Sequence, residues 1–314
     1  MEISNIQIVV NPTAGSGKAG KIAMVIFQKI KSLSDSVINL TFTEKKNDAS
    51  FITREAIIKG AGMIVAVGGD GTINEVVNGF FKDNEPLNPF CELGIINCGT
   101  GGGYAKTLGI PQKLEQQIEL ILRPGSINLD LGYIIYQDFS NNTLSRLFVN
   151  ECQTGIGSKV ASVVGKNYKV FGGTLAFGLM ATIQAILIKP VTLELEYDNE
   201  PVKKTSLIGL VVGNGIECAG GMKLTPDAKL NDGFFDVLSM HNMSIAQRLL
   251  NLSKVYSGKH ILSPYFSVKR CKRIKIGSNQ KVTLEADGEV LGYSPFEIIN
   301  LPSAIRIKAV NNRS

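Results

Sequence analysis

Val67-Gly68-Gly69-Asp70-Gly71-Thr72 is the stretch that decides how this 314-residue chain folds. It follows a run of apolar residues and precedes an apolar-periodic segment that begins near Ile73, as a turn between a buried strand and a helix does. We expect Thr72 to be the N-cap of that helix, because Thr72 and Glu75 have the spacing of a capping box. A helix that begins on glycines presents free backbone N–H groups to a phosphate. Asp70 adds a carboxylate, which faces phosphates only with a cation between them, so the turn predicts Mg²⁺ and a nucleoside triphosphate.

Asn11-Pro12-Thr13-Ala14-Gly15-Ser16-Gly17-Lys18 is a second turn of this kind, after the apolar run 6–10. Together with Gly20 it has the Gly-x-Gly-x-x-Gly spacing of dinucleotide-binding proteins, with Asp35 and Glu44 as candidate ribose ligands. It is not the P-loop of nucleotide kinases, since Pro12 stands where that motif needs glycine. A dinucleotide therefore stays open as the ligand, and an ordinary glycine-rich turn is the alternative for both segments.

The pattern of predicted secondary structure changes near residue 128. Before it, apolar runs alternate with helical patterns, which predicts an α/β domain with a parallel sheet over residues 1–128. The runs lie at 6–10, 37–42, 63–67 and 93–96, and the helical patterns at 18–32, 48–59, 73–81 and 112–122. After it, short β-type runs with few helices between them predict an antiparallel β-sandwich over residues 129–300. These runs lie at 134–136, 143–149, 192–197, 205–212, 234–239, 273–276 and 281–285.

The composition bounds the class of protein. With 314 residues, of which 44% are hydrophobic, the chain is long enough for two domains. The five cysteines are odd in number and lie far apart, so we expect neither a disulfide framework nor a zinc site, and a reducing, cytoplasmic location. Met1–Asn5 lacks the basic and apolar pattern of a secretion signal, and we expect none.

Two segments bear on membrane contact. Phe171–Ile188 carries no charge, but its glycines and its place between β-type runs favour a buried or cleft-lining helix over a membrane span. Five basic residues lie between Lys269 and Lys275, in a chain of net charge +6. They fit either an anionic membrane surface or a solvated strand face. Without tryptophan or an Arg-rich motif, the chain is not expected to bind nucleic acid.

A third glycine turn, Asn97-Cys98-Gly99-Thr100-Gly101-Gly102-Gly103, leads to Leu108-Gly109-Ile110-Pro111. With the two turns above, the segment Ala219–Gly233 and the late Glu285-Ala286-Asp287-Gly288-Glu289, it gives five ordered matches. The chain resembles the diacylglycerol kinase catalytic-domain family, bacterial lipid kinase branch, from Asn11 to about Asn300. The resemblance implies a lipid kinase that uses ATP and Mg²⁺, with its active site in the cleft between an α/β nucleotide domain and a β-sandwich domain. It also implies that the terminal segment, residues 301–314, returns to the first domain.

The family motifs assign roles to individual residues. Asp70 is the metal-linked carboxylate, and Asp130, which could equally be a turn residue, resembles a second acidic member of its network. A structural magnesium site is implied with the Asp232 side chain and the carbonyls of Lys229 and Phe234, although a plain Asn-Asp-Gly turn is the alternative there. Lys18 could equally be a solvated residue of the first helix, and Thr43 could equally be a plain strand-end residue. The implied nucleotide contacts are Asn11, Lys18, Thr43, Gly68, Gly69, Asp70, Gly71, Thr72, Ile73, Asn74 and Thr100.

Asp287 and Glu289 form the segment that resembles the family's catalytic base. If the run from Lys281 continues as a strand, alternation places both carboxylates on one face. Each would then raise the proton affinity of the other, which suits one of them to accept a hydroxyl proton. The alternative is an acidic hairpin turn of the Asp-Gly type.

One position departs from the family pattern. Relatives usually read Gly-Thr-Gly-Asn-Asp where this chain reads Gly99-Thr100-Gly101-Gly102-Gly103, so an acidic residue of the magnesium-linked network is missing at Gly103. Lys106 also stands where arginine is common, which keeps the charge and loses the bidentate geometry. The loss at Gly103 puts full activity in doubt.

The sequence thus predicts an enzyme that transfers the γ-phosphate of ATP to the hydroxyl of a diacylglycerol-like or sphingoid lipid. We expect it in the cytoplasm, peripheral at the inner membrane surface, with a homodimer left open. Two alternatives stay open: a kinase of a soluble acceptor such as NAD, whose family shares the Gly-Gly-Asp-Gly turn, and a non-catalytic lipid- or nucleotide-binding module. The uncharged segment and Asp287 argue against the first, and Gly103 keeps the second open.

Overall fold

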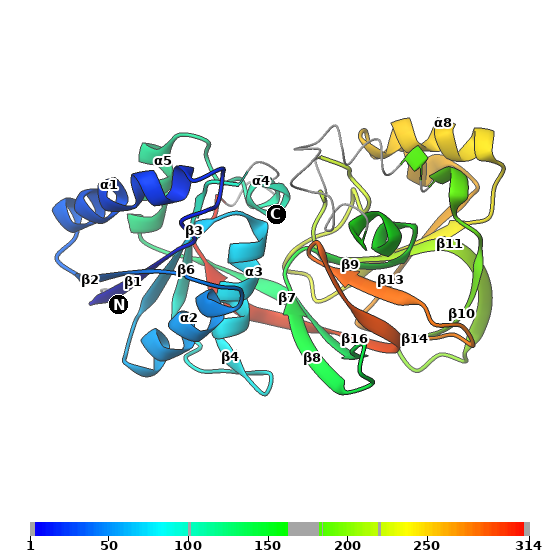
Figure 1. Ribbon diagram of the computed structural model, residues 1–314, viewed down its shortest axis with the longest axis horizontal. Helices are drawn as coiled ribbons and strands as arrows, with labels where there is room; N and C mark the ends of the chain where they lie inside the picture. Colours follow the sequence, from blue (N-terminus) through cyan, green and yellow to red (C-terminus); the bar gives the residue numbers. More distant parts are fainter. Residues whose placement is uncertain (1–3, 100–101, 163–181, 184, 219–220, 311–314) are drawn as a thin grey trace. The chain divides into compact units, whose positions relative to one another are not determined.

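The computed structural model describes residues 4–99, 102–162, 182–183, 185–218 and 221–310. The chain divides into two compact units. Unit 1 comprises Met1–Leu129 and Ser303–Ser314, and unit 2 comprises Asp130–Pro302. The chain therefore leaves unit 1, completes unit 2 and returns to unit 1 with its last segment (Figure 1).

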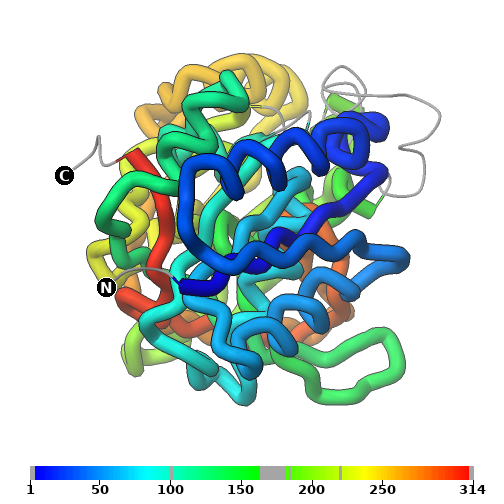
Figure 2. Tube along the Cα trace, turned by 90° about the vertical axis from the view of Figure 1, so that its left-hand side faces the viewer, coloured from blue at the N-terminus to red at the C-terminus, as the bar shows by residue number. Residues whose placement is uncertain are grey.

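Unit 1 is built on a parallel sheet. Its strands follow the order β6–β3–β1–β2, with β1 (Asn5–Val10), β2 (Val37–Phe42), β3 (Met63–Gly68) and β6 (Glu92–Asn97). The end of β16 (Glu289–Ile307) joins this sheet in parallel beside β6, where Arg306 pairs with Glu92 and Ile307 with Leu93. The red end of the chain marks this edge in Figure 1 and Figure 2. The C-terminal segment thus completes the sheet that the N-terminus begins.

Helices cover both faces of this sheet. α1 (Lys18–Leu33) and α5 (Leu114–Leu122) lie on one face, and α2 (Asp48–Ile58) and α3 (Asp70–Gly79) lie on the other (Figure 1). Every residue of β3 is buried, because a central parallel strand packs on both sides. α1 contributes Ala19, Ala23, Ile26 and Ile30, at helical spacing, to the core over β1 and β3. Short elements complete the unit: β4 (Phe81–Lys82), β5 (Glu85–Pro86) and α4 (Gly103–Thr107).

Unit 2 is a β-sandwich-like domain. One path of paired strands runs β13–β12–β11–β10–β14–β16, while β9 pairs with β11 and β15, and β7 pairs with β8 and β16. The registered pairs inside the unit are antiparallel. The strands are β7 (Ile127–Gln137), β8 (Thr143–Phe148), β9 (Glu151–Gly155), β10 (Val191–Tyr197), β11 (Lys203–Gly213), β12 (Phe235–His241), β13 (Phe266–Cys271), β14 (Arg273–Gly277), β15 (Thr283–Ala286) and most of β16.

The core of unit 2 lies between these strands. Phe148 and Phe235 stack at its centre, with ring centroids 5.7 Å apart. Strand β9 was not predicted, because Glu-Cys-Gln-Thr-Gly has no apolar alternation, yet its first four residues are buried. β13 was also missed, since its lysine and arginine conceal the strand pattern. Buried polar side chains in β9 must find partners inside the fold.

Unit 2 also carries α8 (Ile245–Val255) and the 3₁₀ helix η1 (Lys259–Leu262). Ser244 and Gln247 form a capping box that begins α8, with the Ser244 N–H donating to Gln247 Oε1 at 2.9 Å. Most of the predicted helix Phe171–Ile188 lies outside the described residues, and residues 185–187 are helical. Among the helices of the described part, none combines the length and the apolar character that crossing a membrane requires. All five cysteines are buried and unpaired.

Candidate functional site

Three glycine-bearing loops meet at the carboxyl ends of β1, β3 and β6. A Cβ on Gly15 would lie 2.1 Å from the carbonyl oxygen of Cys98, and a Cβ on Gly99 would lie 2.7 Å from the Cα of Gly69. Real side chains do not tolerate such distances, so these glycines let the backbones of the three loops touch. This edge of a parallel sheet is where α/β proteins bind their ligands.

Asn11 connects the first loop to the second. Its backbone N–H donates to the carbonyl of Val67 at 3.0 Å, and its side-chain Nδ2 donates to Thr72 Oγ1 at 3.2 Å. Its Oδ1 accepts the N–H and the hydroxyl of Thr13. The asparagine therefore holds both loops in one arrangement, and its own oxygen is already used by Thr13.

Two further predicted nucleotide residues belong to the same edge of unit 1. Lys18 begins α1 and is exposed. Thr43 follows β2, and its N–H donates to the carbonyl of Val10 at 2.9 Å. Thr100, also predicted, lies outside the described residues.

The helix after the second turn begins earlier than predicted. α3 begins at Asp70 with Gly69 as its N-cap, so Thr72 lies inside the first turn, and the prediction that it caps the helix was wrong. A Cβ on Gly68 would lie 2.3 Å from Thr72 Oγ1, which shows that the threonine packs directly on the end of β3. The hydroxyl thus serves packing and the bond from Asn11, and the helix N–H groups stay without a side-chain cap.

The other residues of this turn differ in what they offer to a ligand. Ile73 and Asn74 are 0% and 1% exposed, and the Ile73 N–H donates to the Gly69 carbonyl at 3.0 Å. Their side chains therefore belong to the interior of unit 1. A Cβ on Gly71 would meet no atom within 4 Å, so packing does not explain that glycine. It leaves room at the N-terminus of α3, where the helix dipole favours an anion.

Asp70 carries a carboxylate with one oxygen satisfied and one not. Its Oδ2 accepts the Gly103 N–H at 3.1 Å, while its Oδ1 is buried and has no hydrogen-bond partner among the described residues. Burial raises the pKa of this carboxyl, and the N–H groups of Gly103 and Tyr104 and the charge of Lys106 oppose that shift. A dehydrated carboxylate oxygen without a donor is a ligand that a divalent cation prefers. Asp70 therefore fits a Mg²⁺ ion bound together with nucleotide phosphates.

Gly103 begins α4, after the left-handed N-cap Gly102 (φ 55°). The residue at the position where the family resemblance implies a carboxylate therefore contacts Asp70 through its backbone N–H. Among the described residues, no group of three or more His, Cys, Asp or Glu side chains is arranged to hold a metal.

Asp287 and Gly288 form the turn between β15 and β16, which corrects the expected extended segment. Their φ values of 45° and 89° are left-handed, as Asp-Gly hairpin turns require. The Asp287 carboxylate accepts the backbone N–H groups of Val149 (2.8 Å), Asn150 (3.0 Å) and Glu151 (3.2 Å). Asp287 thus anchors the turn to the start of β9.

Glu289 lies in different surroundings from Asp287. It is the first residue of β16, and its Oε2 forms an ion pair with Arg146 Nη1 at 2.7 Å. The Glu289 side chain is 26% exposed and that of Arg146 is 17% exposed. The two carboxylates therefore do not share one face. Asp287 is held by the backbone, whereas Glu289 is fixed in direction by a guanidinium and keeps contact with the surface.

Two further carboxyl groups, Glu151 and Glu285, lie buried beneath this turn, and the sequence analysis gave neither a role. They are 5% and 1% exposed. Gln153 Nε2 donates to Glu151 Oε1 at 3.2 Å, and the Gly288 N–H donates to Glu285 Oε1. The Oε2 atom of each glutamate is buried without a partner. Burial raises the pKa of Glu285 to about 8, and burial with the charges of Glu285 and Asp287 raises the pKa of Glu151 well above its usual value.

Glu285→Gln should make the stability of the protein less dependent on pH. Between the ordinary pKa of 4.5 and the folded-state pKa of about 8, the folded chain keeps the Glu285 proton while the unfolded chain has released it. Stability therefore falls as the pH rises through this window. Glutamine keeps an acceptor for the Gly288 N–H and has no proton to lose. The thermal unfolding midpoint of the variant should decline less than that of the wild type from about pH 5 to about pH 8.

The matched control for this measurement is Glu119→Gln, which changes an exposed glutamate of α5. It should reproduce the wild-type slope. A Glu285→Gln variant with the wild-type slope would show that Glu285 is ionised in the folded chain.

Asp130 lies within β7, where it anchors the loop that contains the predicted structural metal site. It is 1% exposed, and its N–H donates to the Leu230 carbonyl at 2.7 Å. Its Oδ2 accepts the Gly233 N–H at 2.7 Å. The structure therefore brings Asp130 together with the loop at Lys229–Phe234 in unit 2, while Asp70 belongs to unit 1.

The predicted ligand Asp232 already has two donors. Its Oδ1 accepts the Phe234 N–H at 3.1 Å, and its Oδ2 forms an ion pair with Arg270. The Arg270 guanidinium also lies over the Phe234 ring, 4.7 Å from its centroid. Arg270 would compete with a cation for this carboxylate, and the structural magnesium site stays a prediction.

The basic segment 269–275 is largely neutralised by carboxylates, which supports its interpretation as a strand face. Lys272 lies over the Phe234 ring at 5.0 Å. The other four basic residues form ion pairs within unit 2: Lys269 with Glu200, Arg270 with Asp232 and Asp236, Arg273 with Glu297, and Lys275 with Glu196. Because these basic side chains are paired with carboxylates, the segment has little net positive charge, and we expect it to attract an anionic membrane only weakly.

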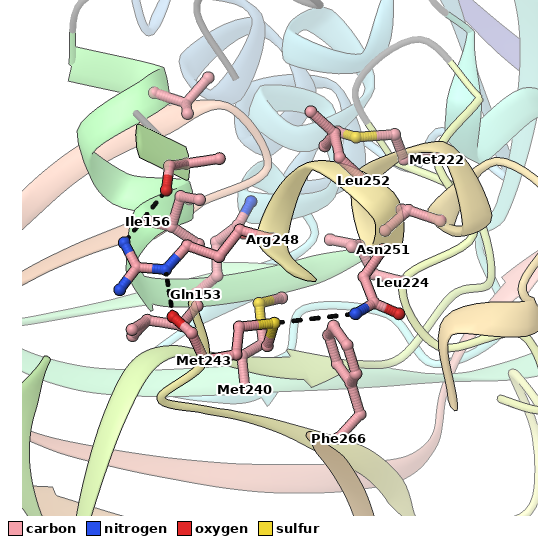
Figure 3. A pocket seen from close by; sticks show the side chains of 15 residues that line it. Gln153, Ile156, Met222, Leu224, Met240, Met243, Arg248, Asn251, Leu252 and Phe266 are labelled. Atoms are coloured by element: carbon pink, nitrogen blue, oxygen red, sulfur yellow. Dashed lines mark hydrogen bonds between the residues drawn. The ribbon is translucent and has the colours of Figure 1, made fainter. Parts of the chain in front are cut away.

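Unit 2 contains an apolar pocket of about 80 Å³ that the sequence did not reveal (Figure 3). Its residues are scattered from β9 to β13, so no local periodicity marks them. Arg248 lies at its wall but is used by the backbone, since it donates to the carbonyls of Ala185 (3.1 Å), Ile188 (2.8 Å) and Met243 (3.0 Å). The apolar lining is Ile156, Val160, Ala185, Ile208, Met222, Leu224, Met240, Met243, Leu252, Val255 and Phe266.

Two family models match the chain. Residues 5–134 match the diacylglycerol kinase catalytic domain, and residues 150–309 match the YegS C-terminal NAD kinase beta sandwich-like domain. The chain therefore combines these two domains and belongs to the diacylglycerol kinase family.

Individual relatives agree with this assignment along the whole chain. The diacylglycerol kinase of Bacillus subtilis (strain 168) is 29% identical over 304 residues, which cover 96% of this chain and 95% of that protein. The diacylglycerol kinase of Staphylococcus carnosus is 26% identical over 301 residues, with 96% and 94% covered.

Two solved structures share the fold. A diacylglycerol kinase from Bacillus anthracis str. Sterne has a TM-score of 0.73 at 20% identity and covers 99% of this chain and 98% of its own. Yeast NADH kinase complexed with NADH has a TM-score of 0.53 at 15% identity, covering 98% and 82%. Since a lipid kinase and an NADH kinase both have this fold, the fold alone does not choose the acceptor.

Proposed function

We propose that this lipid kinase transfers the γ-phosphate of ATP to the hydroxyl of a diacylglycerol-like or sphingoid lipid. The observation that carries the proposal is the apolar pocket of unit 2. Three methionines, Met222, Met240 and Met243, line it, and flexible thioether side chains adapt to irregular apolar ligands (Figure 3). A hydrocarbon chain has the chemistry to fill such a pocket.

The glycine edge of unit 1 is proposed to hold the nucleotide. The room beside Gly71 and the N-terminus of α3 suit phosphate groups, and Lys18 supplies an exposed positive charge. The unpartnered Asp70 oxygen suits the Mg²⁺ ion. When bound, Mg²⁺ neutralises charge on the phosphate that is transferred.

Glu289 is proposed as the general base. A base must accept a proton from the acceptor hydroxyl, so it needs an oxygen that the substrate can reach. The two Asp287 oxygens already accept three N–H groups, whereas the Glu289 side chain is 26% exposed. Asp287 then acts as a positioning residue that fixes the turn from which Glu289 begins.

The two alternatives make different demands on the chain. A soluble acceptor such as NAD carries charged and polar groups, which the apolar pocket cannot satisfy. A non-catalytic module needs no cation ligand, yet Asp70 keeps a buried carboxylate oxygen that has no donor in the part of the chain that the structure describes. Both observations support the lipid kinase over its alternatives.

Leu252→Trp tests the pocket. The larger side chain should occupy part of the cavity and lower turnover of a long-chain lipid acceptor about tenfold or more, because catalysis depends on holding the acceptor in place. ATP affinity should stay unchanged, since the pocket belongs to unit 2. ATP consumption is measured in mixed micelles with long-chain diacylglycerol, with a sphingoid base and with NAD.

Leu33→Trp, at an exposed position on α1, is the control and should behave as the wild type. If the protein phosphorylates NAD and neither of the two lipids, the soluble acceptor would be favoured. ATP consumption with none of the three would favour a binding module. Unchanged lipid turnover in a folded Leu252→Trp variant would remove the pocket from the proposal.

A further inference from the structure

Helix α8 carries apolar side chains both in the pocket and on the surface. Leu252 and Val255 point into the pocket, as Figure 3 shows for Leu252. On the surface, Ile245 is 49% exposed, Leu249 39% and Leu250 65%. A helix that only covers a core has a polar outer face, so exposed leucines on α8 need another explanation.

The exposed row is continuous with the pocket wall. Ile245, Leu249, Leu252 and Tyr256 follow one another at i, i+4, i+7 and i+11, which places them in one line along the helix. Leu252, in the middle of this line, lines the pocket, and Leu249 and Tyr256 on either side are exposed. A ligand that leaves the pocket over this row would stay in contact with apolar side chains.

Segments packed against α8 extend the exposed apolar surface. Arg248 of α8 binds the carbonyls of Ala185 and Ile188, so the residues between them lie next to the helix, and Leu187 is 64% exposed. η1 follows α8 after a short turn and carries Leu262, which is 82% exposed. We call Ile245, Leu249, Leu250, Tyr256, Leu187 and Leu262 the α8 surface.

The chain segment that carries α8 and η1 has charges of one sign. From His241 to Lys281 the sequence contains nine lysines and arginines and no aspartate or glutamate. Those of the strand segment 269–275 are mostly paired, as described above. Lys189, Lys254 and Lys259 are exposed and form no ion pair with a carboxylate in the described part of the chain. Exposed leucines among unpaired lysines match a surface with an apolar interior and anionic head groups.

We infer that the α8 surface docks the protein on an anionic lipid bilayer, so that the pocket opens where its lipid is found. The reason for docking, access to a lipid acceptor, rests on the proposed function. The contact with the bilayer itself requires no catalysis. The leucines would enter the region between head groups and acyl chains, and the three lysines would contact phosphate groups. The pocket of about 80 Å³ is too small for a whole two-chain lipid, so the rest of the acceptor would stay in the bilayer.

The experiment measures binding of the full chain to vesicles without ATP. Vesicles of neutral phosphatidylcholine are compared with vesicles that also contain anionic phosphatidylglycerol, by co-sedimentation. We expect clear binding to anionic vesicles only, weakened by salt. Leu249→Glu combined with Leu250→Glu should lower binding tenfold or more, and Lys254→Gln should lower it about fivefold, since each basic residue near an anionic surface contributes about that factor.

Leu33→Glu combined with Val37→Glu, at exposed apolar positions of unit 1, is the matched control and should bind vesicles as the wild type does. All variants should keep the wild-type unfolding midpoint, because the changed side chains are exposed. The α8 variants should also keep turnover of a short-chain diacylglycerol dissolved as monomers, which needs no membrane. If the wild type does not turn over the short-chain diacylglycerol, the proposed function would be rejected. The measured binding to vesicles would still test the docking inference.

Wild-type vesicle binding by the α8 variants would overturn the inference. So would a wild-type dimer, detected by analytical ultracentrifugation, that Leu249→Glu converts to monomers while vesicle binding stays unchanged. In that case the α8 surface would be an interface with a second copy of the chain.

Discussion

Asp70→Asn should lower the rate of phosphoryl transfer by about 10² to 10³, because it removes the charge that faces the cation and the developing charge on the phosphate. The fold should survive the change. Asparagine has nearly the same shape, and its Oδ1 can still accept the Gly103 N–H that Asp70 accepts now. Turnover of lipid and ATP is measured over a range of Mg²⁺ concentrations, together with the unfolding midpoint.

Asp83→Asn, in the exposed turn between β4 and β5, is the matched control in the same unit. It should retain wild-type turnover. If the Asp70 variant keeps more than about a tenth of the wild-type rate, which corresponds to roughly 1.4 kcal/mol, Asp70 does not hold the catalytic cation.

Glu289→Gln and Asp287→Asn should fail in different ways. Removing a general base lowers kcat by about 10² to 10⁴, so Glu289→Gln should lose turnover while its ATP affinity and its unfolding midpoint change little. Asp287→Asn should instead destabilise unit 2. An amide has one acceptor oxygen for the three N–H groups that Asp287 binds, and each buried donor left without an acceptor costs about 1–3 kcal/mol.

Glu297→Gln is the control for the loss of an ion pair, because Glu297 also lies on β16 and pairs with Arg273 as Glu289 pairs with Arg146. It should keep turnover. A large kcat loss in Asp287→Asn without loss of stability, beside an active Glu289→Gln, would reverse the two roles.

The hydrophobic pattern of the sequence was sufficient to predict single strands and helices. The apolar run before Gly68 predicted β3, and the spacing of Ala19, Ala23, Ile26 and Ile30 predicted the helix over them, because a strand or an amphipathic helix needs only its own periodicity. The glycine turns could also be read from the sequence. Few other residues let backbones approach as closely as Gly15 and Cys98 do.

The sequence by itself therefore determined the two-domain family, the glycine edge of unit 1 and the candidates Asp70, Asp287 and Glu289. It did not determine their surroundings, because those come from distant residues. Asp287 is held by Val149, Asn150 and Glu151, more than 130 positions away, and only folding shows that its carboxylate is occupied. The pocket, the buried Glu151 and Glu285, and the ion pair of Asp232 with Arg270 arise in the same way. Burial and pairing depend on which segments meet in space, and no spacing along the chain contains that information.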